Sequence, residues 1–561
     1  MMSTQPDYPN CQADEHLGDD MHSTNASPPF SLITEIEVAI AVIVFKDKYL
    51  LARRQAHQHQ GDKFEFVGGK IESGEQAKSA LLREVKEELG LELQIEQLTK
   101  LGRIEHFYAD QPDTLPSEQS TEKGSKEVSK ISQPAGKRVH LHVYRVSLSL
   151  PQFGDFSTRD YGLEGQPIIW VNQLDLLAGC YPLPDANLPI LTWLKLPETV
   201  CITQALSHFM QLDEQERVRQ DWVDYHAAHL PQEAWVYLRP QLSRLTEPEQ
   251  MGLSVASNIS AAILSESTIG DNDSYNDLKS NLDGKQKRAL NCQQQALLEL
   301  ASTLKASTAL LQQRADIKGI VSIALDTLLD TFLNELLDNF LTNLFKAEPK
   351  YSAQSIMMNH DKERMPERLV KACFDECIKP YLDTYNDLLN PLIALGQIAA
   401  QHLTHQSLLA LVAGLQLNES SDTNQNDDNQ NYINQNDDPL DNDLRDYKTL
   451  LAFHVCKQIA SAIKLPIIVS CHDEKSVRAA NLLARWRINN HQVPIMAAFI
   501  SPVLPTLTHP NQQALGWSRF AELSQLAEVP VIALGGLSPT DIAEALKHEA
   551  VAVAGIRQFL H

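Results

Sequence analysis

The chain has 561 residues, more than one ordinary domain needs, and 43% of them are hydrophobic, so we expect two or three domains with their own cores. Its formal net charge of −24 argues against stable nucleic-acid binding and against binding to an anionic membrane, because phosphate groups would be repelled. A free nucleotide that arrives with a divalent cation remains compatible with this charge.

The cysteines and the beginning of the chain bear on its compartment. The eight cysteines are scattered without a pairing pattern, which predicts reduced thiols and a cytoplasmic protein. Cys373 and Cys377 have the spacing of a pair of metal ligands, but no second pair or histidine partner follows, so ordinary thiols are favoured. No apolar run has the length of a membrane span, and no secretory signal is visible. Residues 1–35 are rich in Asp, Ser, Pro and Asn, which predicts a disordered tail.

The first predicted domain covers residues 36–196 and begins with a hairpin around Lys46-Asp47-Lys48. Residues 110–137 are rich in Ser, Glu, Lys and Gln without periodicity, which predicts a loop insertion. The predicted strands of this domain are Glu37–Phe45, Tyr49–Ala52, Val139–Leu148 and Pro167–Val171.

A helix is predicted from about Gln76, where apolar residues recur at four-residue steps. Gly90 is expected to end this helix in a left-handed conformation, with Leu91 folding back. Gly68-Gly69 permits a tight loop before it, and Glu75 is expected in an acidic first turn that suits the helix dipole. The predicted buried stripe consists of Ala77, Leu81, Val85 and Leu89.

Three carboxylates share one face of this helix. Glu84, Glu87 and Glu88 lie at i, i+3 and i+4, so they point the same way. They repel one another unless a cation joins them, and ligation by oxygen alone suits Mg²⁺ or Mn²⁺, which keep waters and bridge to phosphates. A charge run is ordinarily a solvated helix face. The fixed spacing from Gly69 and Glu75 to this run favours a metal site instead.

The spacing is Gly69, five residues, Glu75, seven residues, and then Arg83-Glu84-Val85-Lys86-Glu87-Glu88-Leu89-Gly90-Leu91. This stretch resembles the complete signature box of the Nudix hydrolases, which cleave nucleoside diphosphates linked to another moiety. The resemblance implies an α/β/α sandwich for the first domain and a hydrolase that uses Mg²⁺, with Mn²⁺ as the alternative. It assigns the metal to the Gly68 carbonyl, Glu84, Glu87 and Glu88.

A second set of segments narrows the substrate. Residues from Arg53-Arg54 to Phe64-Glu65-Phe66-Val67-Gly68-Gly69-Lys70 resemble the MutT-type enzymes, which hydrolyse oxidised guanine nucleotides. Val67 stands where those enzymes usually have proline, and valine does not fix φ as proline does. The likeness continues in Leu163-Glu164-Gly165-Gln166-Pro167, whose glutamate serves the metal site or activates water. It also continues in Pro184-Asp185-Ala186-Asn187, whose asparagine reads the oxidised base.

The resemblance gives substrate-binding roles to four residues. Arg54 and His59 would contact the phosphate and sugar region, although a surface cation and a plain loop histidine are equally good interpretations of these two. Phe66 would help to form the base pocket. Asn187 would hydrogen-bond the guanine edge, since an amide offers both a donor and an acceptor.

The resemblance also implies the reaction. Water attacks the β-phosphorus, giving a nucleoside monophosphate and pyrophosphate. The cation neutralises the triphosphate while a carboxylate orients or deprotonates the water. Glu84 is the preferred base and Glu164 the alternative, and Glu87 completes the catalytic set.

Residues 197–561 show short apolar runs that alternate with helical segments, the pattern of parallel βα units. Residues 265–350 are interpreted as a helical and polar insertion, and residues 418–445, with their Asn-Gln-Asn-Asp repeats, as a disordered one. The predicted helices are Glu474–Trp486, Trp517–Glu528 and Pro539–His548. The predicted strands are Val200–Gln204, Ala234–Arg239, Ile320–Ala324, Ser355–Asn359, Ile398–Leu403, Leu465–Cys471, Met496–Val503, Val529–Leu534 and Ala550–Gly555.

Four segments near the C-terminus, Ser470-Cys471-His472-Asp473, Ser501–His509, Gly516-Trp517 and Pro530–Gly536, resemble the thiamine-phosphate synthase and TenI family. The likeness is clear over residues 465–560 and weaker from Val200, where Leu238-Arg239 and Asn359-His360-Asp361 match earlier strands. It implies a TIM-barrel-like (β/α)8 domain, so the whole chain is α/β. In such a barrel Gly535-Gly536 binds phosphate through backbone amides. The barrel candidates for a phosphorylated ligand are His472, Thr506, Thr508, Gly535 and Gly536.

Three departures from that family count against synthase activity. His509 replaces the family's lysine, and Ser407 lies near the place of its metal-binding aspartate. Ala554-Gly555-Ile556 stands where a phosphate-binding serine is often found. We therefore expect a barrel kept for structure or ligand sensing, with proton transfer by His472 as the alternative.

The leading hypothesis is an Mg²⁺-dependent 8-oxo-dGTP diphosphatase, fused to a thiamine-synthase-like barrel. It would convert 8-oxo-dGTP to 8-oxo-dGMP and pyrophosphate, a role in nucleotide-pool sanitation that serves DNA replication and repair. One alternative is a thiamine-pathway enzyme whose first domain hydrolyses a thiamine-related pyrophosphate, and the other is a nucleotide-sensing module. The intact carboxylates, Glu84, Glu87, Glu88 and Glu164, count against a pure sensor, and Asn187 favours a purine substrate.

Overall fold

The computed structural model describes residues 34–54, 61–109, 136–205, 209, 215–239, 304–322, 379–416, 452–453, 455–506 and 512–560. The predictions for His59, Thr508 and His509, for the strand Ser355–Asn359 and for the cysteine pair lie outside the described residues. So do those for residues 1–33, 110–135 and 418–445.

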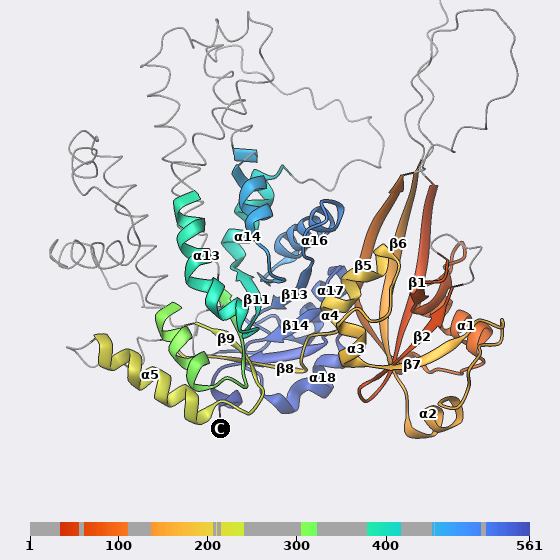
Figure 1. Ribbon diagram of the computed structural model, residues 1–561, viewed down its shortest axis with the longest axis horizontal. Helices are drawn as coiled ribbons and strands as arrows, with labels where there is room; N and C mark the ends of the chain where they lie inside the picture. Colours follow the sequence, from red (N-terminus) through yellow and green to blue (C-terminus); the bar gives the residue numbers. More distant parts are fainter. Residues whose placement is uncertain are drawn as a thin grey trace, which may run out of the picture. The chain divides into compact units, whose positions relative to one another are not determined.

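The N-terminal domain is built on a seven-stranded sheet in the order β3-β2-β1-β6-β5, with β4 paired to β1 and β7 to β2 (Figure 1). The predicted hairpin is confirmed, with Val44 opposite Tyr49 and Phe45 opposite Lys48. The strands are β1 (Thr34–Phe45), β2 (Lys48–Arg53), β3 (Phe64–Glu65), β4 (Val67–Lys70), β5 (Leu98–Ala109), β6 (Gly136–Ser147) and β7 (Ile168–Asn172). Thr34 and Glu35 thus belong to β1 rather than to the predicted tail, and Gly136 and Lys137 belong to β6 rather than to the loop insertion.

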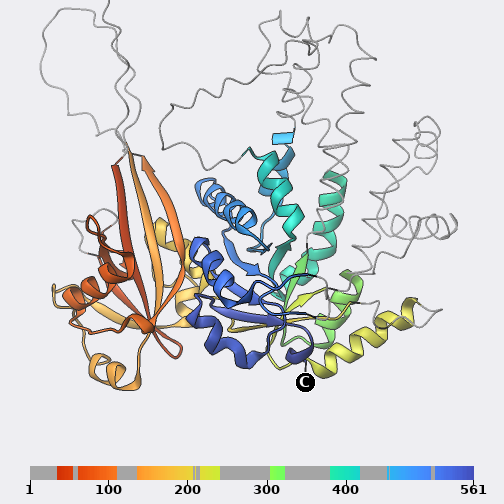
Figure 2. The same ribbon diagram turned by 180° about the vertical axis from the view of Figure 1, so that it is seen from behind.

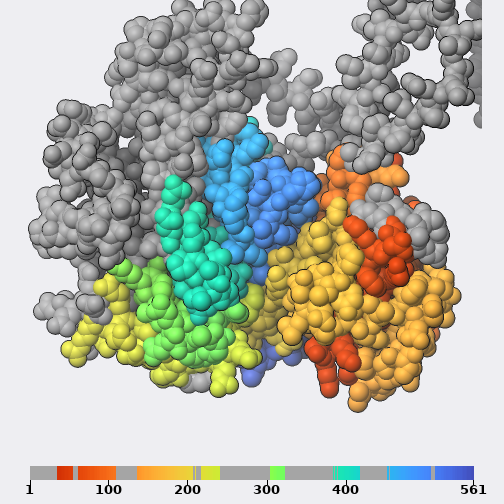
Figure 3. All heavy atoms as spheres, viewed as in Figure 1, coloured from red at the N-terminus to blue at the C-terminus, as the bar shows by residue number. Residues whose placement is uncertain are grey.

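Both faces of this sheet are covered, as a sandwich requires. Along β1, Ala39, Ala41 and Ile43 pack in one core cluster with helix α1 (Ala77–Leu89), and the intervening Ile40 and Val42 are buried as well. The segment after residue 136, coloured gold, forms much of this domain's surface in Figure 3. Its helices are α2 (Leu150–Phe156), α3 (Gln173–Leu177), η2 (Asp185–Asn187) and α4 (Leu188–Trp193), and η1 (Ile95–Gln97) precedes β5.

Helix α1 begins and ends as predicted, but Glu75 does not lie in its first turn. Gly90 adopts φ 66° and ψ 21°, and its N–H donates to the Lys86 oxygen. The buried stripe holds for Leu81, Val85 and Leu89 and adds Ala80, while Ala77 is only half-buried. Gln76, in an extended conformation, caps the helix, so Glu75 does not lie in its first turn, which holds no acidic residue. The prediction for Glu75 was wrong because this carboxylate binds a side chain of α1 instead of the helix dipole.

The C-terminal domain is a closed barrel of eight parallel strands within the described part of the chain, in the order β10-β11-β12-β13-β14-β15-β8-β9. This confirms the predicted TIM-like α/β barrel. Every described apolar run that was predicted as a strand forms one. The strands are β8 (Thr199–Ile202), β9 (Trp235–Leu238), β10 (Lys318–Ser322), β11 (Ile398–Leu403), β12 (Ile467–Cys471), β13 (Ile495–Ile500), β14 (Val531–Leu534) and β15 (Ala552–Gly555).

Side chains alternate between the inside of the barrel and its helical coat. Ile202, Tyr237, Ile320 and Phe499 fill the inside, whereas Val469 packs in the larger cluster shared with the helices. Figure 2 shows the blue C-terminal helices outside the strands, where α16 packs on β12 and β13 and α17 on β13. The helices are α5 (Gln215–His229), α13 (Lys379–Ala394), α14 (His405–Gly414), α16 (Glu474–Asn489), α17 (Gly516–Leu526), η7 (Pro539–Asp541), α18 (Ile542–Lys547) and η8 (Arg557–Phe559).

One predicted insertion proves to contain part of the barrel. Within residues 265–350, a helix over 304–313 precedes β10, and β10 pairs with β9 and β11. Polar residues on both sides of this short apolar strand concealed its place in the fold. Among the described residues, no helix is long and apolar enough to cross a membrane.

Candidate active site

Two glycines make room for the acidic cluster beside α1. A Cβ at Gly68 would lie 2.0 Å from the Ala39 oxygen, so only glycine lets β4 approach β1 this closely. A Cβ at Gly69 would lie 2.2 Å from the Glu84 carboxyl carbon. The missing side chain of Gly69 therefore leaves the space that the Glu84 carboxylate occupies.

Arg83 fixes the carboxylates around it. Its Nη1 atom lies 2.7 Å from Glu84 Oε1 and 3.2 Å from Glu87 Oε2. Its Nε and Nη2 atoms donate to the two oxygens of Glu75 over 3.1 and 3.0 Å, and Nη2 also donates to the Lys70 oxygen. These hydrogen bonds lower the pKa of Glu75. Glu75 thus orients a guanidinium that holds Glu84 and Glu87 in place.

Glu88 faces a small acidic cavity. The cavity has a volume of about 70 Å³. Burial, followed by the charges of Glu164, Glu65, Glu84 and Glu87, raises the pKa of Glu88 to about 8. At neutral pH this carboxyl group holds a proton unless another cation takes its place. The lining residues are Ala52, Arg53, Glu65, Phe66, Val67, Gly68, Glu88, Glu164 and Gln166.

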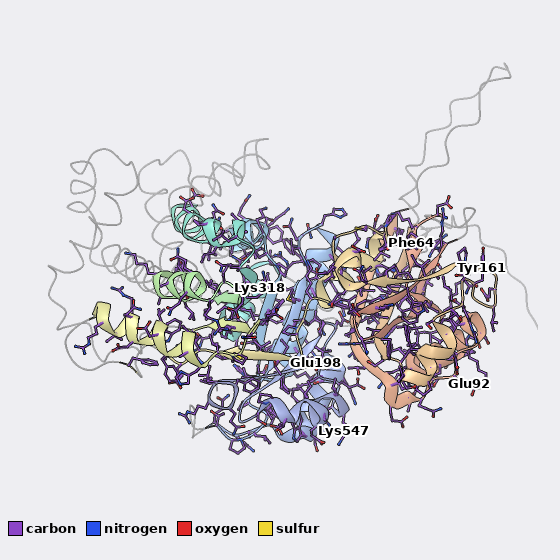
Figure 4. The ribbon with its side chains drawn as sticks, turned by 60° about the horizontal axis from the view of Figure 1, so that its bottom comes forward. Phe64, Glu92, Tyr161, Glu198, Lys318 and Lys547 are labelled. Atoms are coloured by element: carbon purple, nitrogen blue, oxygen red, sulfur yellow. The ribbon has the colours of Figure 1, made fainter. Side chains whose placement is uncertain are left out.

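The loop that carries Glu164 is attached to the C-terminal end of α1. The backbone N–H of Leu163 donates to the backbone oxygen of Glu88 over 2.6 Å, and Arg159 Nη1 donates to the backbone oxygen of Leu89 over 3.0 Å. The last carbonyls of a helix have no partners within the helix, so this loop satisfies them. Figure 4 labels Tyr161, which lies on the same loop and bridges to Pro167. The attachment brings Glu164 to the cavity of Glu88.

The donor set suits a hard divalent cation. Carboxylates and a backbone carbonyl supply oxygen ligands only, as Mg²⁺ and Mn²⁺ prefer. In the part of the chain that the structure describes, no three His, Cys, Asp or Glu side chains converge as they stand into a group that could hold a metal. Arg83 holds Glu84 and Glu87, so these two would have to turn toward Glu88 to share a cation with it.

The predicted substrate-binding residues lie around β3. Arg54 forms an ion pair with Glu65. The pKa of Glu65 is raised, because the effect of burial outweighs the opposing effect of Arg54. Phe66 is buried and borders the acidic cavity. Asn187 is only 5% exposed, and among the described residues its Oδ1 atom has no hydrogen-bond partner. Neither Arg54 nor Asn187 lines the small cavity itself.

The segment before Asn187 packs against β3. Pro182 accepts a hydrogen bond of 2.8 Å from the N–H of Phe64, which is labelled in Figure 4. The rings of Phe64 and Tyr181 meet edge to face at 5.4 Å, and Lys63 lies 3.6 Å from Asp185. These contacts fix the position of η2 and so of the buried Asn187 amide.

The barrel has a larger cavity of about 690 Å³ at the carboxyl ends of its strands. His472, Thr506, Gly535 and Gly536, four of the five barrel candidates, line it together with Arg239 and Arg557. Gly536 adopts φ 70°, and a Cβ there would lie 2.7 Å from the Pro505 oxygen. Ser407 is buried in the first turn of α14, where its backbone N–H donates to Oγ1 of the capping residue Thr404.

Histidines group in this cavity. The Nδ1 atom of His472 lies 2.9 Å from the backbone carbonyl oxygen of Ser501. Because a carbonyl oxygen only accepts, Nδ1 carries the hydrogen. The rings of His405 and His472 are 4.9 Å apart, and burial, then His472, lowers the pKa of His405. His402 lies deeper, between Tyr237 Oη at 2.9 Å and Ser470 Oγ at 2.8 Å, and burial lowers its pKa to about 3.

Several residues of the two cavities and their surroundings could not be identified from the sequence. Arg83 and Gln166 stand inside motifs quoted for their neighbours, so their positions were visible but their contacts were not. Glu65 was quoted only as part of a longer match. His405 and Tyr237 carry no local signal, because only the barrel closure brings them to one cavity.

Comparisons with known proteins agree with two domain types. A family model described as NUDIX domain matches residues 35–147, and one described as thiamine monophosphate synthase matches residues 455–559. The CTP pyrophosphohydrolase of Escherichia coli (strain K12) is 30% identical over 156 residues, 28% of this chain and 88% of that protein. The 8-oxo-dGTP diphosphatase of Proteus vulgaris is 37% identical over 82 residues, 14% of this chain and 71% of that one. The putative thiamine-phosphate synthase 2 of Aquifex aeolicus (strain VF5) is 38% identical over 61 residues, 11% of this chain and only 33% of that one.

Proposed function

Because the chain belongs to the Nudix hydrolase family and also carries a thiamine monophosphate synthase-like domain, we propose that it hydrolyses 8-oxo-dGTP to 8-oxo-dGMP and pyrophosphate. The observation that carries this choice is the buried Asn187 amide, whose oxygen has no partner in the described residues. A buried acceptor of this kind is costly unless a ligand supplies the donor, and an oxidised purine offers N–H groups. The similarity to 8-oxo-dGTP diphosphatases supports the same choice, whereas the similarity to a CTP pyrophosphohydrolase makes CTP the rival substrate.

In this proposal a divalent cation, Mg²⁺ first, is held by Glu88, Glu84, Glu87 and the Gly68 carbonyl. When bound, the cation neutralises the triphosphate charge and polarises the attacked phosphorus. Glu88 would hold the cation in place of its proton, and the cation's charge would offset the effect of burial and of the neighbouring carboxylates. The missing side chain of Gly69 leaves the space that the Glu84 carboxylate occupies, and this carboxylate is our first candidate for the base that accepts the proton of the attacking water. Glu164 is the second candidate for that base.

The position of attack can be tested with ¹⁸O-labelled water. Attack at the β-phosphorus places the label in pyrophosphate, and attack at the α-phosphorus places it in the nucleoside monophosphate. We expect labelled pyrophosphate and unlabelled 8-oxo-dGMP by mass spectrometry. Label in 8-oxo-dGMP would contradict the proposed reaction.

For the barrel we propose binding of a phosphorylated ligand without thiamine-phosphate synthesis. Gly535-Gly536 and the two arginines line the cavity, which suits a phosphate group. Ser407, buried in the first turn of α14, is a poor Mg²⁺ ligand compared with the carboxylate of the family. The test expresses the full chain, with Glu88→Gln to silence the first domain, in a thiamine-phosphate-synthase-deficient strain. We expect no growth without thiamine, and growth would overturn the proposal.

A further inference from the structure

Gln166 has an unusual position for an amide side chain. It is only 9% exposed, and its Nε2 atom donates to the backbone oxygen of Glu88 over 3.3 Å. Since a carbonyl oxygen cannot donate, the NH₂ group must face Glu88 and the amide oxygen must face the other way. The orientation of the amide is therefore fixed by its partner.

The fold makes room for this amide. A Cβ at Gly162 would lie 2.6 Å from both the Gln166 amide carbon and Nε2. Gly162 N donates to the backbone oxygen of Gln166 over 2.9 Å, so the loop closes on itself around the amide. Glycine at position 162 is required for this arrangement, because any side chain would displace the amide.

The amide oxygen of Gln166 is the unusual atom. It is buried, it has no hydrogen-bond partner among the described residues, and Gln166 lines the acidic cavity. The same cavity is lined by Glu65, Glu88 and Glu164, whose carboxylates accept hydrogen bonds when ionised, and by Arg53, whose guanidinium donates to Asp62. Once a cation has taken the place of the Glu88 proton, the three carboxylates offer this oxygen no donor, and a ligand can supply one. Water bound to a divalent cation is such a donor, because the cation polarises its O–H bonds.

We propose that Gln166 is a positioning residue whose Oε1 accepts a hydrogen bond from a water molecule on the divalent cation held by Glu88. This inference rests on the proposed function of the same site. Through Nε2 the residue also holds the Glu164 loop against the end of α1. One amide thus orients a cation-bound water and a carboxylate that can act on it.

Two variants separate the acceptor from the structural hydrogen bond. Gln166→Leu removes both the donor and the acceptor, whereas Gln166→Glu removes the donor and keeps an acceptor. Mn²⁺ affinity, measured by electron paramagnetic resonance titration of the full chain without nucleotide, is the direct readout. We expect Gln166→Leu to lose about tenfold in Mn²⁺ affinity, as is typical of residues that orient metal ligands. We expect no loss of Mn²⁺ affinity for Gln166→Glu.

A matched control is Gln173→Leu. Gln173 Nε2 donates to the Leu194 backbone oxygen over 3.0 Å, a hydrogen bond of the same kind in the same domain, and this residue does not line the acidic cavity. We expect wild-type Mn²⁺ affinity for it. For Gln166→Leu we also expect kcat to fall by about tenfold or more, with KM for the nucleotide little changed.

Two results would overturn the inference. Mn²⁺ affinity of Gln166→Leu within about twofold of the wild type would show that the oxygen does not serve the cation. An equal loss in Gln166→Leu and Gln166→Glu would show that only the hydrogen bond to Glu88 matters. If Gln166→Leu does not fold, the test uses Gln166→Glu. A loss of Mn²⁺ affinity greater than that of Gln173→Leu overturns the inference, and wild-type Mn²⁺ affinity supports it. A wrong substrate assignment would appear separately, as a wild-type chain that binds Mn²⁺ but prefers another nucleotide.

Discussion

The backbone N–H of Leu163 donates a 2.6 Å hydrogen bond to the backbone oxygen of Glu88. This contact joins the end of the signature helix to a loop that is distant in the sequence. It brings Glu164 and Gln166 to the cavity of Glu88, where burial and then the nearby carboxylates raise the pKa of Glu88 to about 8. The attachment of two segments thus places several carboxylates close together, and the proposed cation would reduce their repulsion.

Glu88→Gln should keep the fold and lose about 10²-fold or more in kcat. The amide preserves the shape of the carboxylate but removes the charge that binds the cation. Without metal, the melting temperature should stay the same or rise, since an amide needs no proton to be neutral, whereas the raised pKa of Glu88 makes this carboxyl group unfavourable in the folded state at neutral pH. With Mg²⁺, the wild type should gain stability and the variant should not. Calorimetry with and without Mg²⁺ measures both effects, and wild-type kcat at saturating Mg²⁺ would contradict the assignment.

Gly69→Ala should reduce hydrolysis much more than stability. The added methyl group would overlap the Glu84 carboxylate, which can move because it is the end of a flexible side chain. We expect kcat to fall by about tenfold or more while the melting temperature changes little. Gly154→Ala is the control, because a Cβ there meets nothing within 4 Å. Equal activity of the two variants would show that the position of Glu84 is unimportant.

Asn187→Ala should weaken discrimination between 8-oxo-dGTP and dGTP more than it lowers kcat. A methyl group cannot pair with a base edge, so we expect the ratio of kcat/KM values to fall by about tenfold or more. Steady-state kinetics on both nucleotides measures this ratio. An unchanged ratio would mean that the base is recognised elsewhere.

The barrel should lose stability as the pH falls from about 6.5 to about 4. His226 is fully buried, accepts a hydrogen bond from Gln204 N and donates one to the Trp222 oxygen, and burial lowers its pKa to about 4. In this window the unfolded histidine binds a proton and the folded one does not, so the unfolding free energy falls by up to about 3 kcal/mol. Above about pH 6.5 this contribution is fully present.

The variant His226→Gln isolates this effect. Glutamine can accept and donate but does not titrate in this range. Urea unfolding at pH 7 and at pH 5 should show a smaller loss of stability for the variant than for the wild type. An equal loss would mean that His226 is protonated in the folded state.

Local patterns predicted most elements of the fold. The apolar runs of β1 and β2 and the four-residue stripe of Leu81, Val85 and Leu89 are properties of single segments, and the structure confirms the predicted hairpin and helix. The position predicted for Glu75 was wrong because the extended Gln76 separates it from the first turn of α1, which local composition does not show. Strand β10 was predicted as a strand but assigned to an insertion, since its neighbours are polar.

The sequence predicted only part of the candidate site. The signature box names Glu84, Glu87 and Glu88, but not that Arg83 holds the first two and that Glu88 alone faces the buried cavity. The contact of Gln166 with Glu88 spans 78 residues. Such contacts form only when segments that are distant in the sequence pack together, so no pattern within one segment predicts them.

The central claim is that this chain acts on an oxidised purine nucleotide. The most direct measurement is kcat/KM for pyrophosphate release from 8-oxo-dGTP, dGTP, CTP and thiamine diphosphate, each with the full chain and saturating Mg²⁺. We predict that kcat/KM for 8-oxo-dGTP exceeds that for each of the others by about 10²-fold or more, since a site built to pair a base edge rejects a base that leaves its polar groups unpaired. A higher kcat/KM for CTP or for thiamine diphosphate would contradict it.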